Sequence, residues 1–500
     1  MEDAAAANAD DQIREKIKIA ETTIGMPIAW ARNEQDVEGL MAKGLGELYQ
    51  RAFSKPPYEE SFTLAEVEEF FKEYVNDGGD VFAACDETTG KVIAFYATTP
   101  LSLAFLKATG LEKHSLGNSS YHADEGVEES YRKRGISAAL MTLAMDNDKI
   151  RHRDHALLRT SVQNYTQIHV FAGKNLRHIS DVFQDAVSTR IDGSVKTDRR
   201  AFYVNDLQDN NPVKCDMLNH VTIARPGGND TALVWDAVPR NQQAALSLRI
   251  QKAYPGVEQV MFVEKKPDGS YRGQMAGGEF CGNATRALAY VLANGKDTDV
   301  TLEVSGMADP VTVNVRHGEA TINIAVADTP GLIQQSGGDS IVDLGGITFL
   351  VTSPGKGSGA AIASAAGGPA GRDQEALRAL KQAGLDTKPA AGVLVVEEIS
   401  PGKYKLEPYV YVSETGTLRR ETSCGSGSAA LGILLANSAP GNSATIEIVQ
   451  PSGLSLFVGA AKDAAGNYNV SVDGAVTVPF DGRMRLIEEY KPKAANPGGP

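Results

Sequence analysis

The chain has little cysteine, a deficit of positive charge and no long apolar run, and each shortage excludes a class of protein. Four cysteines in 500 residues, irregularly spaced, are too few for a disulfide scaffold or a paired Cys-x-x-Cys zinc site. A net charge of -14 disfavours nucleic acid, whose phosphates attract basic surfaces. No stretch approaches the roughly 18 apolar residues that span a bilayer, and the N-terminus does not resemble a signal peptide. We therefore expect a cytoplasmic protein with neither a membrane nor a nucleic-acid partner.

The length of the chain predicts more than one domain, because 500 residues at 42% hydrophobic content exceed one core of typical size. The polar, proline-containing stretch 206–214 marks the main boundary. A glycine-, alanine- and serine-rich passage at 354–371 is expected to be a mobile surface loop. We divide the chain into an N-terminal extension at 1–25, a first domain at 26–208, two halves of a second domain at 215–340 and 341–488, and a disordered tail at 489–500.

The second domain contains an internal repeat around two of its cysteines. Cys281 is followed by Gly-Asn-Ala-Thr-Arg-Ala-Leu-Ala, and Cys424 is followed by Gly-Ser-Gly-Ser-Ala-Ala-Leu-Gly. Each cysteine thus precedes a glycine, a small polar residue and an alanine-rich helix, which predicts two halves of similar build. Cys85 and Cys215 lack this context, and we interpret them as small buried residues.

A cysteine at the first turn of a helix meets unpaired N–H groups and the positive end of the helix dipole, which favour a thiolate. The backbone N–H groups of Gly282 and Asn283, and those of Gly425 and Ser426, are expected to form two facing anion sites for a substrate carboxylate. A thiolate on one face of an α-carbon and a thiol on the other can remove and return its proton without pyridoxal phosphate. The sequence therefore predicts a cofactor-independent amino-acid racemase or epimerase with the two repeated cysteines as its catalytic pair.

The repeat resembles the diaminopimelate epimerase family over roughly Leu218 to Glu489. The segment Gly227 to Asp230 is similar to that family's turn after its first strand, and Tyr411 to Glu414 is similar to the strand that carries a substrate-binding glutamate. The resemblance implies two pseudo-symmetric α/β halves, each a central helix wrapped by a curled mixed sheet, and a homodimer. It also implies that Asn229 and Glu414 bind the substrate.

Departures from that family bear on the substrate. The family's Asn-Pro-His segment is replaced at 352–355, its Asn-Val-Asn strand at 391–394, and Thr415 stands where an arginine follows the glutamate. Those groups would hold the distal end of diaminopimelate, so another amino acid is expected, with diaminopimelate epimerase proper as an alternative. The form Gly-Gly-Glu-Phe-Cys-Gly-Asn-Ala is similar to the histidine-racemase branch, which favours a histidine-type substrate or a residue within a peptide. Lys266 is either a substrate-binding residue or a solvated surface lysine.

The first domain carries a basic, glycine-containing turn between a strand and a helix. Arg-Lys-Arg-Gly-Ile-Ser at 132–137 resembles the acyl-coenzyme A loop of the GNAT N-acetyltransferases, and a hairpin at 80–97 and a strand at 157–162 follow that family's order. Successive N–H groups at such a turn can cradle a pyrophosphate. The resemblance implies that acetyl-coenzyme A is bound by residues of the turn and one after the next strand, namely Arg132, Arg134, Gly135, Ser137, Ala138 and Asn164.

The sequence leaves the activity of this domain open. Seven residues after Asn164 the family has a tyrosine as general acid, but Phe171 has no hydroxyl, and Ser137 replaces a glycine or alanine. Glu125 or Glu128 is either a general base for an amine or a solvated surface residue. One hypothesis is a bifunctional racemase and N-acetyltransferase, and the other is a racemase with a docking domain for a peptide or carrier-bound substrate. No histidine pair has HxH or HExxH spacing, so we expect no metal.

Overall fold

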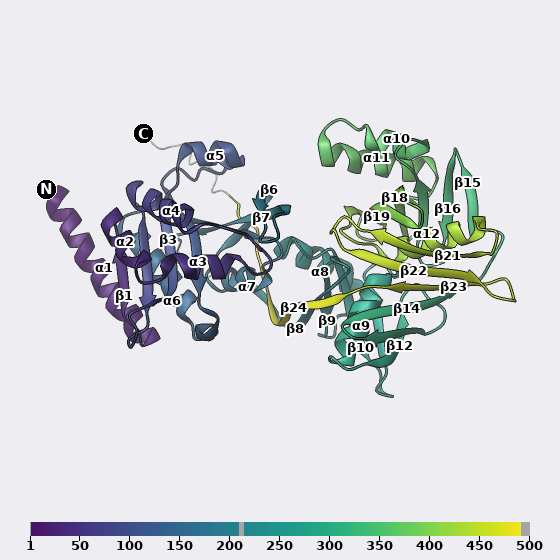
Figure 1. Ribbon diagram of the computed structural model, residues 1–500, viewed down its shortest axis with the longest axis horizontal. Helices are drawn as coiled ribbons and strands as arrows, with labels where there is room; N and C mark the ends of the chain where they lie inside the picture. Colours follow the sequence, from purple (N-terminus) through teal and green to yellow (C-terminus); the bar gives the residue numbers. More distant parts are fainter. Residues whose placement is uncertain (1, 210–214, 492–500) are drawn as a thin grey trace. The chain divides into compact units, whose positions relative to one another are not determined.

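The computed structural model describes residues 2–209 and 215–491, and the chain divides into two compact units (Figure 1). The first unit comprises Met1–Asp216 together with Arg485–Pro500, and the second comprises Met217–Met484. The boundary expected at 206–214 lies partly outside the described residues, as does most of the tail expected at 489–500.

The first unit is built on one seven-stranded sheet. Its strands are β1 (Ile28–Ala31), β2 (Asp80–Cys85), β3 (Val92–Pro100), β4 (Ser119–Val127), β5 (His155–Ser161), β6 (Arg177–Thr189) and β7 (Val195–Asp206). The order across the sheet is β1-β2-β3-β4-β5-β7-β6, and all neighbours are antiparallel except β4 and β5. The predicted hairpin at 80–97 is confirmed as β2 and β3.

Helices pack around this sheet. They are α1 (Glu2–Ile24), α2 (Glu34–Met41), α3 (Leu45–Phe53), α4 (Leu64–Asn76), α5 (Leu103–Thr109), α6 (Ile136–Ile150) and α7 (Tyr165–Gly173), with short 3-10 turns at Glu112–His114 and Glu129–Tyr131. The expected N-terminal extension is the helix α1, which packs on α6 and buries Ile13, Ile17 and Ala20. No helix within the described ranges is long and apolar enough to cross a bilayer.

The parallel strands β4 and β5 separate before they end. Their pairing runs from Ser119 with His155 to His122 with Leu158, whereas β4 continues to Val127 and β5 to Ser161. Side chains from both diverging ends line one cavity. The expected sequence of strand, basic turn and helix is confirmed, since α6 follows β4 and α7 follows β5.

The second unit consists of two halves of similar build. Their strands are hydrogen-bonded into one closed barrel. The strands of the first half are β8 (Cys215–Pro226), β9 (Thr231–Val234), β10 (Gln259–Lys265), β11 (Tyr271–Met275), β12 (Thr298–Val304), β13 (Val311–Arg316) and β14 (Glu319–Val326). Those of the second half are β15 (Ile333–Ser336), β16 (Asp339–Asp343), β17 (Thr348–Thr352), β18 (Ala390–Ser400), β19 (Lys403–Val412), β20 (Thr417–Arg420), β21 (Ser443–Val449), β22 (Ser455–Lys462), β23 (Tyr468–Asp473) and β24 (Val476–Ile487). Antiparallel pairing of β14 with β23 joins the halves.

Each half wraps a central helix, as the family resemblance implied. Helix α9 (Gly282–Ala293) packs against β9 to β14, and helix α12 (Gly425–Ser438) packs against β16, β17 and β21 to β23. The two central helices also contact each other. Helices α8 (Arg240–Ala253), α10 (Gly357–Ala363) and α11 (Gly368–Gln382) lie outside the sheets (Figure 1). The predicted mixed α/β fold of two pseudo-symmetric halves is confirmed.

The prediction of a surface loop at 354–371 is wrong, because this passage forms α10 and the first turn of α11. Asp339 fixes the start of α10 by accepting a hydrogen bond from the Ser358 N–H at 3.0 Å, and Ile362 is buried beneath it. A small-residue composition was misread as flexibility, although alanine is the best helix former.

The disordered tail expected at 489–500 needs a partial correction. Glu489 forms a β-bridge with His178, and the Tyr490 N–H donates to the His178 carbonyl at 2.9 Å. The Tyr490 side chain also packs against a buried cluster of the first unit. Residues 492–500 lie outside the described ones.

Candidate active site

The two repeated cysteines occupy equivalent positions at the starts of the central helices. Cys281 and Cys424 are the N-caps of α9 and α12, with nearly equal backbone angles of φ -128° and ψ 110°, and φ -132° and ψ 101°. Each Sγ accepts a hydrogen bond of 3.3 Å from the N–H three residues on, in Ala284 and Gly427. Both thiols line one cavity with about 680 Å³ of free space, including its open mouth.

The two helix starts lie too close for any residue larger than glycine. A Cβ on Gly425 would lie 2.8 Å from Asn283 Oδ1, and one on Gly282 would lie 3.2 Å from the Ser426 backbone nitrogen. The Gly282 N–H donates to Ser426 Oγ at 2.9 Å, and Asn283 Nδ2 donates to the Ser423 carbonyl at 3.0 Å. These bonds lock one turn to the other and fix how the cysteines face the cavity.

Three carboxyl groups line the same cavity, those of Glu258, Glu279 and Glu421. Glu279 and Glu421 are only 7% and 4% exposed, and Oε2 of each has no conventional hydrogen-bond partner among the described residues. Glu258 accepts hydrogen bonds from the Thr422 N–H at 2.8 Å and from Asn229 Nδ2 at 2.9 Å. Burial raises the pKa of Glu258 to about 8 and that of Glu421 to about 7, and it also raises the pKa of Glu279.

A side-chain amide connects the two cysteines through one of these carboxyls. The Cys281 thiol donates to Gln259 Oε1 at 2.9 Å, and Gln259 Nε2 donates to Glu421 Oε1 at 2.7 Å. The Cys424 thiol faces the Glu421 carboxyl closely enough that a weak hydrogen bond affects the pKa of both groups. Glu421 therefore interacts with one thiol directly and with the other through Gln259.

The surroundings of both thiols favour their protonated form. Burial raises the pKa of Cys281 and of Cys424, and the charge of Glu421 raises both further. The N–H groups at the helix starts lower these pKa values, but their effect is the smaller one. The helix starts were expected to favour a thiolate, and their N–H groups do lower both pKa values, but desolvation outweighs this effect.

The first unit has a separate cavity between the diverging ends of β4 and β5, with about 600 Å³ of free space including its mouth. Glu125 lines it, and its Oε2 accepts a hydrogen bond from Ser137 Oγ at 3.2 Å. Burial raises the pKa of Glu125 to about 7. Glu128 instead pairs with Arg51 at 2.6 Å and does not line the cavity.

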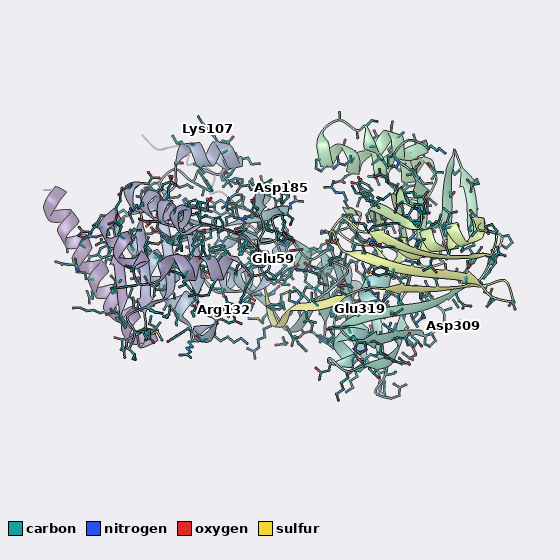
Figure 2. All side chains as sticks on the ribbon, viewed as in Figure 1. Glu59, Lys107, Arg132, Asp185, Asp309 and Glu319 are labelled. Carbon is teal, nitrogen blue, oxygen red and sulfur yellow. The ribbon has the colours of Figure 1, made fainter. Side chains whose placement is uncertain are left out.

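The basic turn before α6 has the features expected of a phosphate-binding loop. Lys133 and Gly135 have φ of 63° and 79°, and Gly135 caps α6 without a side-chain hydrogen bond, which leaves the first N–H groups of the helix available. Arg132, labelled in Figure 2, and Arg134 are exposed beside the turn. Residues of this turn therefore fit the diphosphate of acetyl-coenzyme A.

A model of the family described as "Histidine racemase CntK N-terminal domain" matches residues 218–484. The chain belongs to this family. The histidine racemase of Fusobacterium nucleatum is 26% identical over 289 residues, which are 55% of this chain and 98% of the relative. The histidine racemase of Staphylococcus aureus is 27% identical over 290 residues, which are 52% of this chain and 95% of the relative. A Salmonella typhimurium acetyltransferase structure, described with its cofactor acetyl-CoA, covers 37% of this chain and 97% of that chain at 13% identity, with a TM-score of 0.28.

Family membership confirms the resemblance to the histidine-racemase branch and places the second unit among amino-acid racemases, which are isomerases. Of the residues expected to hold the substrate, Gly425 and Ser426 line the cavity. Gly282 and Asn283 do not line it, because the N–H of the first and the amide of the second bond across to the α12 turn. Asn229 is buried behind Glu258, which it positions.

Glu414 lies outside the cavity of the racemase unit, contrary to the prediction. Val412 pairs with Thr417 across β19 and β20, so Glu414 falls in the exposed turn between these strands. Glu421, three residues before the second cysteine, is the carboxyl that the cavity contains. Lys266 also lies outside it and pairs with Glu303 at 2.6 Å.

Several residues of the racemase site were missed from the sequence. Glu279 and Glu421 stand just before the two cysteines, so the repeat itself could have indicated them. Glu258 and Gln259 lie at the start of β10, far from both motifs, and no local pattern marks them. Within the described part of the chain, no cluster of three or more histidine, cysteine or acidic side chains is arranged to hold a metal ion.

The residues predicted to bind acetyl-coenzyme A do not all line the same cavity of the first unit. Asn164 lines the cavity beside Glu125 and donates from Nδ2 to the Tyr58 hydroxyl at 3.3 Å, and Phe171 also lines this cavity. Gly135 and Ala138 instead line a shallow cavity beside α1. Ser137 lies between the two, since its hydroxyl donates to Glu125.

Proposed function

We propose that the second unit is a cofactor-independent amino-acid racemase that inverts an α-carbon by proton transfer between Cys281 and Cys424. The observation that carries this proposal is the pair of buried thiols, each an N-cap of a central helix, that line one cavity. Two acid–base groups on opposite sides of a bound α-carbon are what inversion requires.

The reaction needs one thiolate, and Glu421 is the group that creates it. The Cys424 thiol passes its proton to the Glu421 carboxylate, which lines the same cavity. The resulting Cys424 thiolate removes the α-proton from one face, and the Cys281 thiol returns a proton to the other. The N–H groups of Gly425 and Ser426 at the first turn of α12 stabilise the charge that develops on the substrate carboxylate.

A histidine-type substrate is favoured by the charge of the cavity. The buried carboxyls of Glu279 and Glu421 each have an oxygen that lacks a conventional partner within the described residues. A substrate with an α-ammonium and an imidazole N–H offers donors for both, whereas an apolar side chain would leave one carboxyl unsatisfied. The relatives named above are histidine racemases, which points the same way. A histidine residue within a peptide is the alternative substrate.

The test is incubation of the reduced protein in deuterium oxide with a panel of free L-amino acids and short peptides. We expect a mass gain of one deuterium at the α-carbon of histidine, lost in Cys424→Ala and kept in Cys85→Ala, a cysteine buried in the first unit. Exchange only within peptides would move the assignment to a peptide substrate. Exchange on no compound would refute the proposed activity.

A second candidate function, acetyl transfer to an amine, is favoured by one observation in the first unit. The Glu125 carboxyl, whose pKa is raised to about 7, lies in a cavity and contacts Ser137 of the basic turn. Acetyl-coenzyme A supplies an acetyl thioester, and Arg132, Arg134 and the N–H groups at the start of α6 would hold its diphosphate. Glu125 can then accept a proton from an incoming ammonium. Binding of acetyl-coenzyme A, measured by calorimetry, tests this function, and absence of binding would favour the docking role.

A further inference from the structure

The cavity of the first unit is lined by side chains of both charges. Some of them form ion pairs with protein groups and others do not. Two arginines line it, Arg159 on β5 and Arg200 on β7. Arg200 is neutralised by Glu60 at 2.6 Å and by Asp198 at 3.1 Å. Arg159 forms no ion pair with any described residue, and its guanidinium donates only to the side-chain oxygen of Gln184. One lining cation is therefore left with unused donors.

The two carboxyl groups that line the cavity, Asp124 and Glu125, also differ in their partners. Asp124 Oδ2 accepts hydrogen bonds from the Tyr74 hydroxyl at 2.6 Å and from the Tyr49 hydroxyl at 3.4 Å, which holds it in the cavity wall. Glu125 forms no ion pair among the described residues. Glu125 and Arg159 thus line the cavity without an ion pair among the described residues, although the charge of Arg159 lowers the pKa of Asp124, whose Oδ2 already accepts from the two tyrosine hydroxyls.

We propose that this cavity binds a free α-amino acid, with its ammonium at Glu125 and its carboxylate at Arg159. A zwitterion satisfies both groups at once, and an arginine can bind a carboxylate through two parallel hydrogen bonds. A peptide N-terminus or a simple amine would bring no carboxylate, and a polyamine would place further positive charge beside two arginines. The hydroxyls of Tyr58 and Thr160, 2.9 Å apart, border the same space.

This inference deepens the second candidate function by naming its acceptor, but the binding it describes does not require acetyl transfer. Together with the racemase cavity, it gives the chain two sites for free amino acids. The two sites share no lining residue, so each can be removed separately.

Equilibrium dialysis of the full chain with isotope-labelled L-histidine tests the proposal. We expect two bound molecules per chain in the wild type and one in Arg159→Met, because loss of a charge-assisted pair weakens binding by about tenfold or more. Arg199→Met is the matched control, since Arg199 lies on β7, stacks on Phe183 at 4.3 Å and does not line the cavity. Arg159→Lys keeps the charge and should retain part of the binding. Histamine, which lacks the carboxylate, should not displace the Arg159-dependent molecule.

The outcomes separate this inference from the proposed racemase. A single bound molecule that is lost in Arg159→Met would support the inference and count against histidine binding in the second unit. A single bound molecule that persists in Arg159→Met would overturn the inference and leave the racemase intact. Displacement by histamine as effective as by histidine would overturn the role given to Arg159, whatever the number of sites.

Discussion

At the scale of single residues, the cysteines of the racemase site depend on a neighbouring carboxyl more than on their helix ends. Burial raises the pKa of both thiols more than the helix N–H groups lower it, so these N–H groups mainly position the sulfur atoms. Glu421 contacts the Cys424 thiol and reaches the Cys281 thiol through Gln259. In the proposed mechanism, the protonation states that inversion needs therefore depend on Glu421.

Glu421→Gln removes the proton acceptor while preserving shape and the hydrogen bond to Gln259. We expect α-deuterium exchange to fall by roughly 10²- to 10⁴-fold, the usual contribution of a positioned acid or base. Glu414→Gln is the matched control, because Glu414 is exposed outside the cavity and should leave the rate unchanged. Equal rates in Glu421→Gln and the wild type would remove Glu421 from the mechanism.

The pH dependence of exchange should report the same carboxyl. Because burial raises the pKa of Glu421 to about 7, the residue is a carboxylate, and can accept the Cys424 proton, only above that pH. The exchange rate should therefore fall as the pH is lowered through about 7 in the wild type. This decline should be absent from the residual activity of Glu421→Gln. A wild-type decline centred near the ordinary glutamate pKa would argue against a buried carboxyl in this role.

The sequence indicated the two cysteines of the proposed catalytic pair but not their surroundings. Cys281 and Cys424 were recognised because their turns repeat with the same composition. Glu414 was misassigned because a hairpin turn carries it away from the cavity, and a one-dimensional pattern cannot show where a turn points. Gln259 reaches the site only because β10 passes beside both helix starts, a consequence of tertiary packing.

At the scale of elements, the site depends on two helices that start within van der Waals distance of each other. Glycine at 425 is required by packing, since a Cβ there would lie 2.8 Å from Asn283 Oδ1 and 3.1 Å from the Asn283 backbone nitrogen. The same close approach makes Gly282 and Gly425 structural residues of the turns. The repeat showed that a glycine and then a polar residue follow each cysteine. It did not show that the two turns contact each other.

Gly425→Ala should therefore disturb both stability and activity. We expect a loss of about 1–3 kcal/mol in the free energy of unfolding, typical of overpacking, together with slower exchange. Gly39→Ala is the contrasting control, because Gly39 lies within α2 with open space around it and the substitution should stabilise the helix slightly. Chemical denaturation monitored by circular dichroism gives both values. An unchanged stability in Gly425→Ala would show that the helix starts can move apart.

At the scale of the whole molecule, the chain combines two units with separate cavities and separate proposed chemistries. The fold class was accessible from the sequence, since each unit carries its own motif. The roles of α1 and of Tyr490 were not, because both depend on packing against elements distant in the sequence.

Separate cavities predict separate losses of function. Substitution of Arg132 and Arg134 by alanine should weaken acetyl-coenzyme A binding, because two cations beside the phosphate-binding turn are removed. The same double variant should exchange the α-proton at the wild-type rate. Calorimetry and deuterium uptake measure the two effects on one preparation. A parallel loss of both would indicate that the units do not act independently.

The most direct test of the central claim is deuterium incorporation from deuterium oxide into L- and D-histidine, resolved by enantiomer, in the wild type and in Cys281→Ala and Cys424→Ala. We predict labelled product of inverted configuration from both enantiomers in the wild type. Neither variant should invert, since each cysteine serves one face of the α-carbon. Inversion at the wild-type rate in either single variant would contradict proton transfer between two cysteines.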